Sequence, residues 1–481
     1  MNSILTSLSS EVVSEACEPI ALASAAFARR YPGEPGARRP VHTVYGGAHL
    51  FRADLARKLG LAAIASVADY APDALTFALA LGLPGSASLV APPSPIASFN
   101  AAFSEDAHAK RGPLWLAETV RARVLEKLRR EPVEDLRIDF EDGYGARPDA
   151  EEDDHALAAA REVGEGMTHG TLPPFLGIRI KGLGAETRRR AVRTLDLFLT
   201  ALASTHRGLL PGGFVVTLPK ITVAEEVAAL ASLLDALEAK LGHARGAIAI
   251  ELMIEAPQLL LDPGGASVLP RLVDAGRGRV VGAHLGAYDY TAACDVVASH
   301  QTLAHPACDL ARRMMQLAFA GTAVRIVDGA TNVLPIPPHR AAAGGHLGSR
   351  ELSHNHETVI AAWKLHHDSI RRALIQGFYQ GWDLHPAQLP VRYAATYAFF
   401  LEGLDLAESR LVNFVNKAAQ ATRLGQVFDD AATGQGLLNF FLRAVDAGAL
   451  TEADAAARTH LSLTELRGKS FAKIVAGRRC P

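Results

Sequence analysis

The sequence lacks the features that mark secreted, membrane-spanning and nucleic-acid-binding proteins. Its 481 residues carry a net charge of −2 and no basic block, which makes nucleic acid a poor candidate partner. No apolar run approaches the ~20 residues that a membrane span needs. The start, Met1 to Ile20, has no charged segment followed by an apolar one, so we expect no signal peptide. These absences predict a cytoplasmic protein without a membrane partner.

Cysteine is also scarce. The four cysteines are scattered and lack the spacing of zinc ligands, which favours unpaired thiols in a reducing compartment. Apolar residues, in contrast, make up 49% of the chain, so a large core is expected and disorder is not. The length suits one large α/β barrel with extra elements, or two to three smaller domains.

Short β-rich runs alternate with helical stretches rich in Ala, Leu and Arg, which is typical of βα units around a parallel sheet. Eight runs are strand candidates: Val41–Tyr45, Leu136–Phe140, Leu176–Ile180, Gly213–Leu218, Ala247–Ile254, Arg279–Leu285, Ala323–Val327 and Gly381–Leu384. Eight strands with intervening helices predict an α/β fold of the (β/α)8 TIM-barrel type. The active site of such a barrel lies at the carboxyl ends of its strands.

Two segments of the chain are additional to a minimal (β/α)8 barrel. Residues 62–131 form an insert between the first two strands that is far longer than a βα connection needs, with loop-like runs at 83–88 and 91–95. Beyond Pro390 the chain becomes helical again. We therefore predict a catalytic barrel over residues 1–390 and a C-terminal helical extension over 391–481. Ser353 is expected to cap a helix that runs from roughly Glu357 to Gln376.

Three apolar runs end in acidic residues, at Asp139, Glu255 and Asp289. Carboxylates are costly to bury unless they are paired, protonated or bound to a cation. Several of them at one end of a parallel sheet indicate a hard cation with oxygen ligands. Glu255 and Asp289 follow adjacent strands, so they are the candidate ligands of one Mg2+ or Mn2+. The alternative is that each only caps the helix that follows it.

Asp139, Glu141 and Asp142 crowd one strand end. Three carboxylates so close together cannot all ionise cheaply unless cations lie nearby. They are therefore candidate catalytic residues for proton transfer. The alternative is a helix N-terminus whose charges pair with Arg137 or Arg147.

Three basic side chains complete the candidate site. Arg179 lies inside a β-rich run, where its guanidinium could grip a carboxylate with two hydrogen bonds or serve only as a counter-ion. Lys220 is a weaker candidate for the same role. A Schiff-base role for Lys220 is a less favoured hypothesis than contact with a carboxylate. His385 ends the eighth strand candidate and could shuttle protons, although a lone histidine beside proline more often serves packing.

Six short motifs, in order, resemble those of the citrate lyase β-subunit-like proteins. They are similar to the D-L-E-D, R-I-N, L-P-K, I-E-T-A, G-A-D-D and H-P-x-Q segments of that family. In this chain they stand at Ile138–Gly143, Arg179–Lys181, Leu218–Lys220, Met253–Ala256, Gly286–Asp289 and His385–Gln388. The wider family includes malyl-thioester lyases and metal-dependent hydroxy-oxo-acid aldolases on a phosphoenolpyruvate/pyruvate-type barrel.

The resemblance implies that Glu255 and Asp289 bind Mg2+ and that Arg179 binds and polarises the substrate's oxygens. It also implies that Gly286 and Ala287 offer backbone N–H groups to the substrate's carboxylate. Lys220 and His385 are counted as further candidate substrate-binding residues. The chain departs from the family in three respects, one of which is that Tyr290 replaces the leucine usual after the metal aspartate.

Asp142 stands where the pyruvate aldolases of the family carry a histidine. The long insert and the C-terminal helices are unlike the short citrate lyase β-subunit, so the chain is not expected to be that subunit. Our leading hypothesis is a Mg2+-dependent carbon–carbon lyase or aldolase that acts on a small 2-oxo or 2-hydroxy acid through a metal-stabilised enolate. The proton would move through the acidic cluster, a metal-bound water or a group from a neighbouring subunit.

Two alternatives stay open. One is a lyase or synthase of the malyl-CoA lyase or malate synthase type, with a coenzyme A thioester as substrate. The other is a non-catalytic barrel with a regulatory or assembly role. We also expect a homo-oligomer, with the helices after Pro390 at the interface or over a barrel mouth. The apolar stretches 398–401 and 437–442 favour that interface, although they could instead pack on their own chain.

Overall fold

The structure is a computed structural model of the chain that describes residues 7–33, 37–90, 111–342, 344–416, 422–424, 427–429, 431–468 and 474. Its centre is a sheet of eight parallel strands with the order β7-β6-β5-β4-β3-β2-β1-β8. The strands are β1 (His42–Gly47), β2 (Asp135–Asp139), β3 (Phe175–Arg179), β4 (Val215–Leu218), β5 (Ala249–Ile254), β6 (Val280–Leu285), β7 (Arg325–Val327) and β8 (Gly381–Asp383). Each predicted strand is therefore confirmed.

The sheet curls into a nearly closed (β/α)8 barrel, which confirms the predicted fold. Strands β7 and β8 are the two ends of the sheet order. The N–H of Asp328, just after β7, donates to the carbonyl of Gln380, just before β8, at 2.9 Å. The seam between these two strands is thus bridged by the backbone, although they form no ladder in the described sheet.

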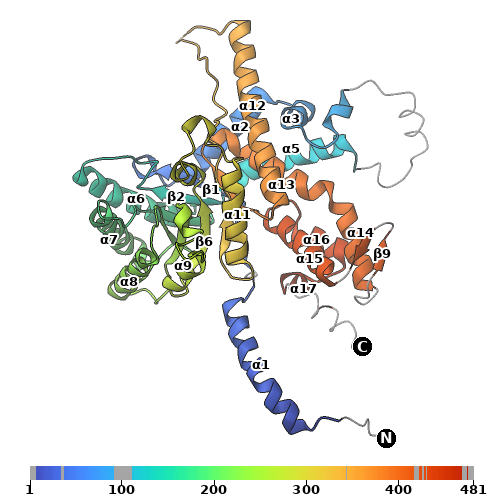
Figure 1. The fold of residues 1–481 in the computed structure, drawn as a ribbon. Helices are drawn as coiled ribbons and strands as arrows, with labels where there is room; N and C mark the ends of the chain where they lie inside the picture. The colour runs from blue at the N-terminus through green and yellow to red at the C-terminus, as the bar shows by residue number, and fades with distance from the viewer. Residues whose placement is uncertain are drawn as a thin grey trace.

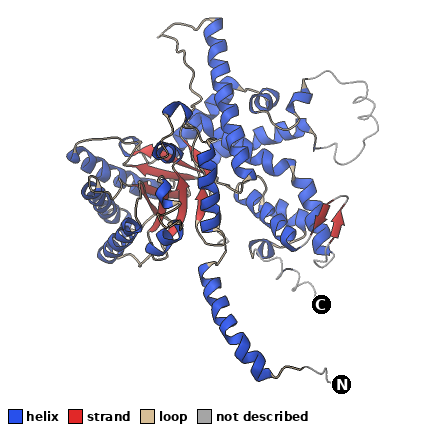
Figure 2. Ribbon diagram, viewed as in Figure 1, coloured by secondary structure: helices blue, strands red, loops and turns tan. Residues whose placement is uncertain are grey.

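Helices cover the outside of the barrel (Figures 1 and 2). They are α6 (Asp149–His169), α7 (Arg188–Ser204), α8 (Ala224–Leu241), α9 (Leu269–Ala275), α11 (Pro306–Phe319) and α12 (Ser349–Ile375), with the short α10 (Ala287–Ala293) after β6. Helix α12 begins earlier than the sequence suggested. Its cap is Gly348, whose N–H donates to Glu351, so Ser353 lies inside the helix and the prediction that it caps this helix is wrong.

The insert between β1 and β2 adds a helical layer made of α2 (Leu55–Tyr70), α3 (Ala74–Leu81) and α5 (Pro113–Arg130). These helices pack against one another and against α12 and α13 (Leu389–Glu402). The aromatic rings of Phe77 and Tyr70 lie edge-on to the buried Trp363 of α12. The predicted loop at 91–95 lies outside the described residues.

The C-terminal helices continue the same hydrophobic core. They are α14 (Leu404–Asn416), α15 (Ala431–Asp446), α16 (Glu452–Thr459) and α17 (Leu463–Arg467), with a small hairpin of β9 (Thr422–Leu424) and β10 (Val427–Asp429). Phe400, Leu401, Leu438 and Phe441 are almost fully buried in their own chain. The two apolar stretches therefore satisfy intramolecular packing, which was the alternative to an interface.

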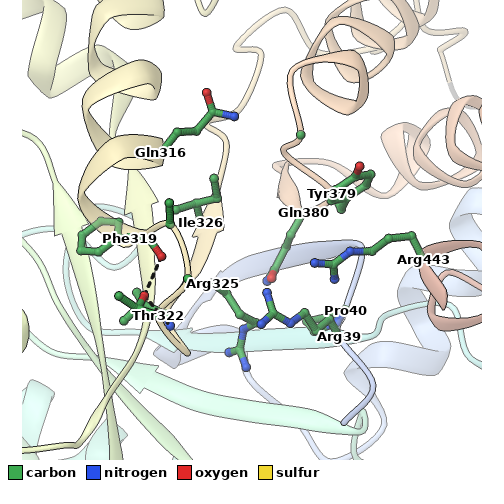
Figure 3. Close-up of a pocket in the computed structure, with 14 residues that line it drawn as sticks. Arg39, Pro40, Gln316, Phe319, Thr322, Arg325, Ile326, Tyr379, Gln380 and Arg443 are labelled. Atoms are coloured by element: carbon green, nitrogen blue, oxygen red, sulfur yellow. Dashed lines mark hydrogen bonds between the residues drawn. The ribbon is translucent and has the colours of Figure 1, made fainter. Parts of the chain in front are cut away.

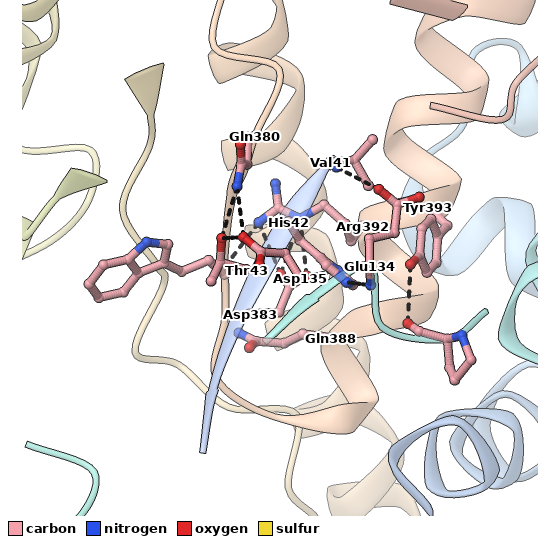
Figure 4. Close-up of polar contacts among 12 residues, drawn as sticks. Val41, His42, Thr43, Glu134, Asp135, Gln380, Asp383, Gln388, Arg392 and Tyr393 are labelled. Atoms are coloured by element: carbon pink, nitrogen blue, oxygen red, sulfur yellow. Dashed lines mark hydrogen bonds and ion pairs between the residues drawn. The ribbon is translucent and has the colours of Figure 1, made fainter. Parts of the chain in front are cut away.

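A buried polar network ties β1, β8, α12 and α13 together (Figure 4). The carboxylate of Asp383 lies 2.8 Å from His42 Nδ1 and 2.8 Å from His366 Nε2. Arg392 donates to the same carboxylate at 2.9 Å. Attraction by Arg392 and these hydrogen bonds outweigh burial and hold the pKa of Asp383 well below its usual range. His42 and His366 are thus structural residues of this network.

Helix α1 (Ser10–Arg30) extends away from the rest of the molecule and has no buried residue (Figure 1). Val12, Val13, Ile20, Leu22 and Phe27 are all exposed on it. By length and composition, no single described helix is a candidate membrane span, and only α2 and α3 pass that test jointly, across a 96° bend.

Candidate active site

The carboxyl ends of the strands bring the predicted acidic residues around one ammonium group. Lys220, just after β4, places Nζ 2.6 Å from Asp289 and 3.3 Å from Asp142. The same atom lies 3.6 Å from Glu141 and 3.9 Å from Glu255. Residues from four different strand ends therefore meet at one mouth of the barrel.

Lys220 has a larger part in this arrangement than its sequence suggested. Its backbone adopts φ +54°, a left-handed conformation that is uncommon outside glycine, and its N–H donates to Glu255 at 2.6 Å. Burial alone would lower the pKa of Lys220, but attraction by Glu255 and a hydrogen bond to Asp289 raise it above its usual range. A Schiff base requires a neutral amine, so this environment disfavours that role.

Arg179, at the end of β3, is held by Asp139 in a two-point contact. Its Nε donates to Asp139 at 2.7 Å and its Nη2 at 2.5 Å. Asp139 also accepts from the backbone N–H groups of Glu141 at 3.0 Å and Gly143 at 2.7 Å. Because its oxygens are fully engaged, Asp139 positions Arg179 and the following loop. A part for Asp139 in proton transfer stays a prediction.

The third nitrogen of the guanidinium faces the site. Arg179 Nη1 lies 3.2 Å from Glu141 and 3.9 Å from Asp142. The ring of Tyr45, on β1, lies 4.7 Å from the guanidinium carbon and supports it from the other side. The alternative pairing of the acidic cluster with Arg137 or Arg147 is wrong, because Arg179 fills that place.

Glu141 and Asp142 occupy different environments. Burial raises the pKa of Glu141 to about 7, despite the attraction of Arg179. Attraction by Lys220 and Arg179 outweighs burial and lowers the pKa of Asp142, whose side chain is 58% exposed. A group that titrates near neutral pH can both take and return a proton, so Glu141 is the best candidate in the cluster for proton transfer.

Glu255 is almost fully buried just after β5, and burial raises its pKa to about 8. Gly286 lies against it so closely that a Cβ on this glycine would be 2.4 Å from Glu255 Cγ. The N–H of Gly286 already donates to the carbonyl of Ile254 at 3.0 Å. The expected backbone contact with a substrate carboxylate would therefore fall to Ala287, at the start of α10.

The site carries more negative than positive charge. In the described part of the chain, the five carboxylates of Asp139, Glu141, Asp142, Glu255 and Asp289 surround two cationic groups, those of Arg179 and Lys220. Within the described ranges, no group of three or more His, Cys, Asp or Glu side chains forms a ready-made metal site. Glu255 and Asp289 both face the Lys220 ammonium, and their carboxylate oxygens are donors that would suit a hard cation such as Mg2+ or Mn2+.

Below this mouth, the barrel interior holds a charged layer that the sequence did not reveal. Arg137 donates to Glu251 at 2.7 Å and to Asp135 at 3.0 Å. His284 lies 3.3 Å from Glu251 and accepts from Trp382 at 2.8 Å. The members of this layer come from β2, β5, β6 and β8, which are far apart in the sequence. No local pattern could have identified them.

His385 lies at the start of a short 3-10 helix over Pro386–Gln388. Its Nδ1 accepts from the N–H of Ala387 at 3.2 Å, and the side chain of Gln388 accepts from the His385 N–H at 3.1 Å. Burial lowers the pKa of His385, so it is neutral near pH 7. These contacts agree with a packing role for His385. That His385 binds the substrate stays a prediction.

Solved structures with a similar course of the chain include two enzymes. A citrate lyase from Burkholderia xenovorans LB400 is 19% identical with a TM-score of 0.49, covering 71% of this chain and 92% of its own. A magnesium/glyoxylate complex of malate synthase from Haloferax volcanii is 16% identical with a TM-score of 0.41, covering 75% and 92%. At these values the likeness concerns the fold alone.

No curated protein gives a significant sequence match. A family model described as a domain of unknown function, DUF6986, matches residues 20–474. That span contains the barrel, the insert, the acidic mouth and the C-terminal helices. The chain therefore belongs to the DUF6986 family.

Proposed function

We propose that the protein is a Mg2+-dependent carbon–carbon lyase or aldolase that acts on a small 2-oxo or 2-hydroxy acid. The observation that carries this proposal is the arrangement at the barrel mouth. A guanidinium fixed by Asp139 lies beside a carboxyl group with a pKa of about 7 and a pair of carboxylates suited to a hard cation. The motif resemblance described above agrees with it.

The roles of the residues follow from their contacts. Arg179 would hold and polarise the substrate's oxygens through Nη1, because Nε and Nη2 are already engaged by Asp139. Glu141 would accept and return the proton of the hydroxyl group at the bond that breaks. A divalent cation held by Glu255 and Asp289 would stabilise the negative charge that develops on the substrate. The Lys220 ammonium would move away from Glu255 and Asp289 when the cation binds, or would bind a substrate carboxylate that is distant from the cation.

A coenzyme A thioester substrate is the second candidate, and a specific observation favours it. A cavity of about 790 Å3 lies beside the same mouth, between the loops after β3 and β4 and helices α7 and α8. Arg188 and Arg189 line it with apolar Leu183 and Val223, and Glu225 and Glu226 also face it. Basic and apolar side chains together suit a long phosphorylated thioester.

A turnover screen tests the proposal and separates the two candidates. The full chain with Mg2+ is offered pairs of the 2-oxo acids pyruvate, glyoxylate and oxaloacetate, and separately each of these acids with an acyl-CoA, and the condensation products are measured. Product formation without acyl-CoA supports the aldolase, and product formation only with it supports the thioester enzyme. If no pair reacts and the protein has no measurable Mg2+ affinity, the non-catalytic alternative replaces both.

A further inference from the structure

A second polar cavity lies at the opposite end of the barrel, where β7, β8 and β1 begin. Its volume is about 260 Å3, roughly the space of nine water molecules in the liquid. Arg39 precedes β1, Arg325 begins β7, and Gln380 precedes β8, while Arg443 reaches in from α15 (Figure 3). It lies beside the seam at which β7 and β8 form no ladder in the described sheet.

The lining of this cavity is strongly basic. It includes three guanidinium groups, from Arg39, Arg325 and Arg443, and no Asp or Glu among the described residues that line it. Arg325 Nη2 donates to Glu251 at 3.1 Å, which fixes this side chain from the barrel interior. The Arg443 guanidinium lies 4.8 Å from the ring centre of Tyr379. Planar forks held in this way are suited to multi-oxygen anions.

Two polar atoms at the cavity lack a hydrogen-bond partner in the part of the chain that the structure describes. One is Nε of Arg325, a donor, and the other is Oε1 of Gln380, an acceptor. Gln380 is only 5% exposed, and its amide nitrogen is fixed by a 2.9 Å hydrogen bond to Thr43. A buried acceptor without a donor is costly. A ligand that brings both acceptor oxygens and one hydroxyl donor would satisfy both atoms.

We propose that this cavity is a binding site for a small hydroxyl-bearing oxyanion, separate from the carboxylate-rich mouth at the other end of the barrel. Its anionic oxygens would accept from Arg39, Arg325 and Arg443, and its hydroxyl would donate to Gln380 Oε1. A hydroxy-polycarboxylate and a protonated phosphate group share this chemistry. The site is independent of the proposed lyase activity, since none of its lining residues belongs to the acidic mouth.

Calorimetric titration of the full chain tests this site. The probes are citrate, tricarballylate, which lacks only the hydroxyl of citrate, and inorganic phosphate, at constant ionic strength with EDTA present to keep metal chelation out. We expect saturable binding of citrate or phosphate, and the tighter of the two identifies the ligand class. Arg39→Gln and Arg443→Gln should each raise that Kd by about ten-fold or more, the loss of one charged contact. If citrate binds, tricarballylate should bind more weakly.

Two control variants make the test specific. Arg57→Gln removes the same charge from an exposed position on α2 and should leave the Kd unchanged. Lys220→Gln alters the acidic mouth and should also leave it unchanged. Absence of saturable citrate and phosphate binding into the millimolar range would overturn the proposal. So would a Kd that responds to Lys220→Gln but to neither arginine variant.

A second measurement covers the case in which an arginine variant does not fold. Crystals of the unaltered protein soaked in citrate or phosphate should show the anion within hydrogen-bond distance of Arg325 Nε and Gln380 Oε1. An empty cavity at saturating probe would contradict the proposal.

Discussion

At the scale of single residues, the role of each of the five carboxylates in the site depends on the groups that surround it. Asp139 is engaged by Arg179 and two backbone N–H groups, whereas Glu141 is buried with a pKa of about 7. The sequence predicted that these residues gather, since each follows a strand. It could not separate their roles, because those depend on Arg179 and Lys220, which come from other strands.

We expect Arg179→Lys to lower kcat/KM by roughly a hundred-fold while the fold persists. Lysine keeps the charge but cannot contact both oxygens of Asp139 and still present a nitrogen to the substrate. Steady-state kinetics measures the loss, and the thermal midpoint checks the fold. Arg57→Lys, on the surface of α2, is the matched control. Near-normal turnover by Arg179→Lys would reduce Arg179 to a counter-ion.

Glu141 should set the pH dependence of bond cleavage. Its raised pKa means that the carboxylate form is lost as the pH falls through about 7, so kcat/KM for cleavage should rise with pH across that value. Because a nearby cation favours the carboxylate, this limb should lie at lower pH when Mg2+ is saturating than when Mg2+ is limiting. Glu141→Gln should remove the limb along with most of the activity. An unchanged profile in this variant would assign the proton to another group.

At the scale of elements, short apolar runs that stop at polar residues were sufficient to find all eight strands. The boundaries were less accurate, as at Gly213, which precedes β4 and adopts φ +65°. The layer formed by α2, α3 and α5 packs against α12 and α13, which are distant from it in sequence. Such contacts leave no local signal.

The contact between β1 and β8 depends on one buried carboxylate, that of Asp383, and should be sensitive to its loss. Asp383→Ala leaves His42, His366 and Arg392 without their shared partner, so we expect a loss of about 3–5 kcal/mol in the free energy of unfolding. Urea denaturation measures it. Asp368→Ala, which removes an exposed partner of Lys364, should change stability by about 0.5 kcal/mol or less. Equal effects of the two variants would contradict the structural role of the network.

The same network predicts a pH effect. Because the folded pKa of Asp383 is lowered, its contribution to stability is present above the ordinary pKa of an aspartate and is lost as the pH falls through the folded value. The acid limb of the stability curve should therefore be shallower in Asp383→Ala than in the unaltered protein. Parallel curves would assign that limb to other carboxyl groups.

At the scale of the whole molecule, the barrel presents different chemistry at its two ends. The carboxyl ends of the strands carry an excess of carboxylates, and the amino ends carry the basic cavity of Arg39, Arg325 and Arg443. Helix α1 lies outside both, with its apolar residues exposed. The C-terminal helices bury their apolar stretches, so α1 replaces them as the candidate contact between subunits.

We expect the protein to form a homo-oligomer through α1. Val12, Ile20, Leu22 and Phe27 are exposed along one projecting helix, and burying them against a second copy would remove a sizeable apolar surface from water. Light scattering at micromolar concentration should give a multiple of the chain mass, and deletion of residues 1–30 should lower it. A monomeric full-length protein would contradict this expectation.

The metal dependence of turnover tests the proposed function most directly. With the best substrate pair from the screen, product formation is measured in EDTA and then during titration with Mg2+, for the unaltered protein and for Glu255→Gln. We predict no product in EDTA, recovery with added Mg2+, and a much higher Mg2+ requirement or no recovery in the variant, since one of two carboxylate ligands is lost. Full activity in EDTA, or an unchanged Mg2+ requirement in Glu255→Gln, would contradict the account.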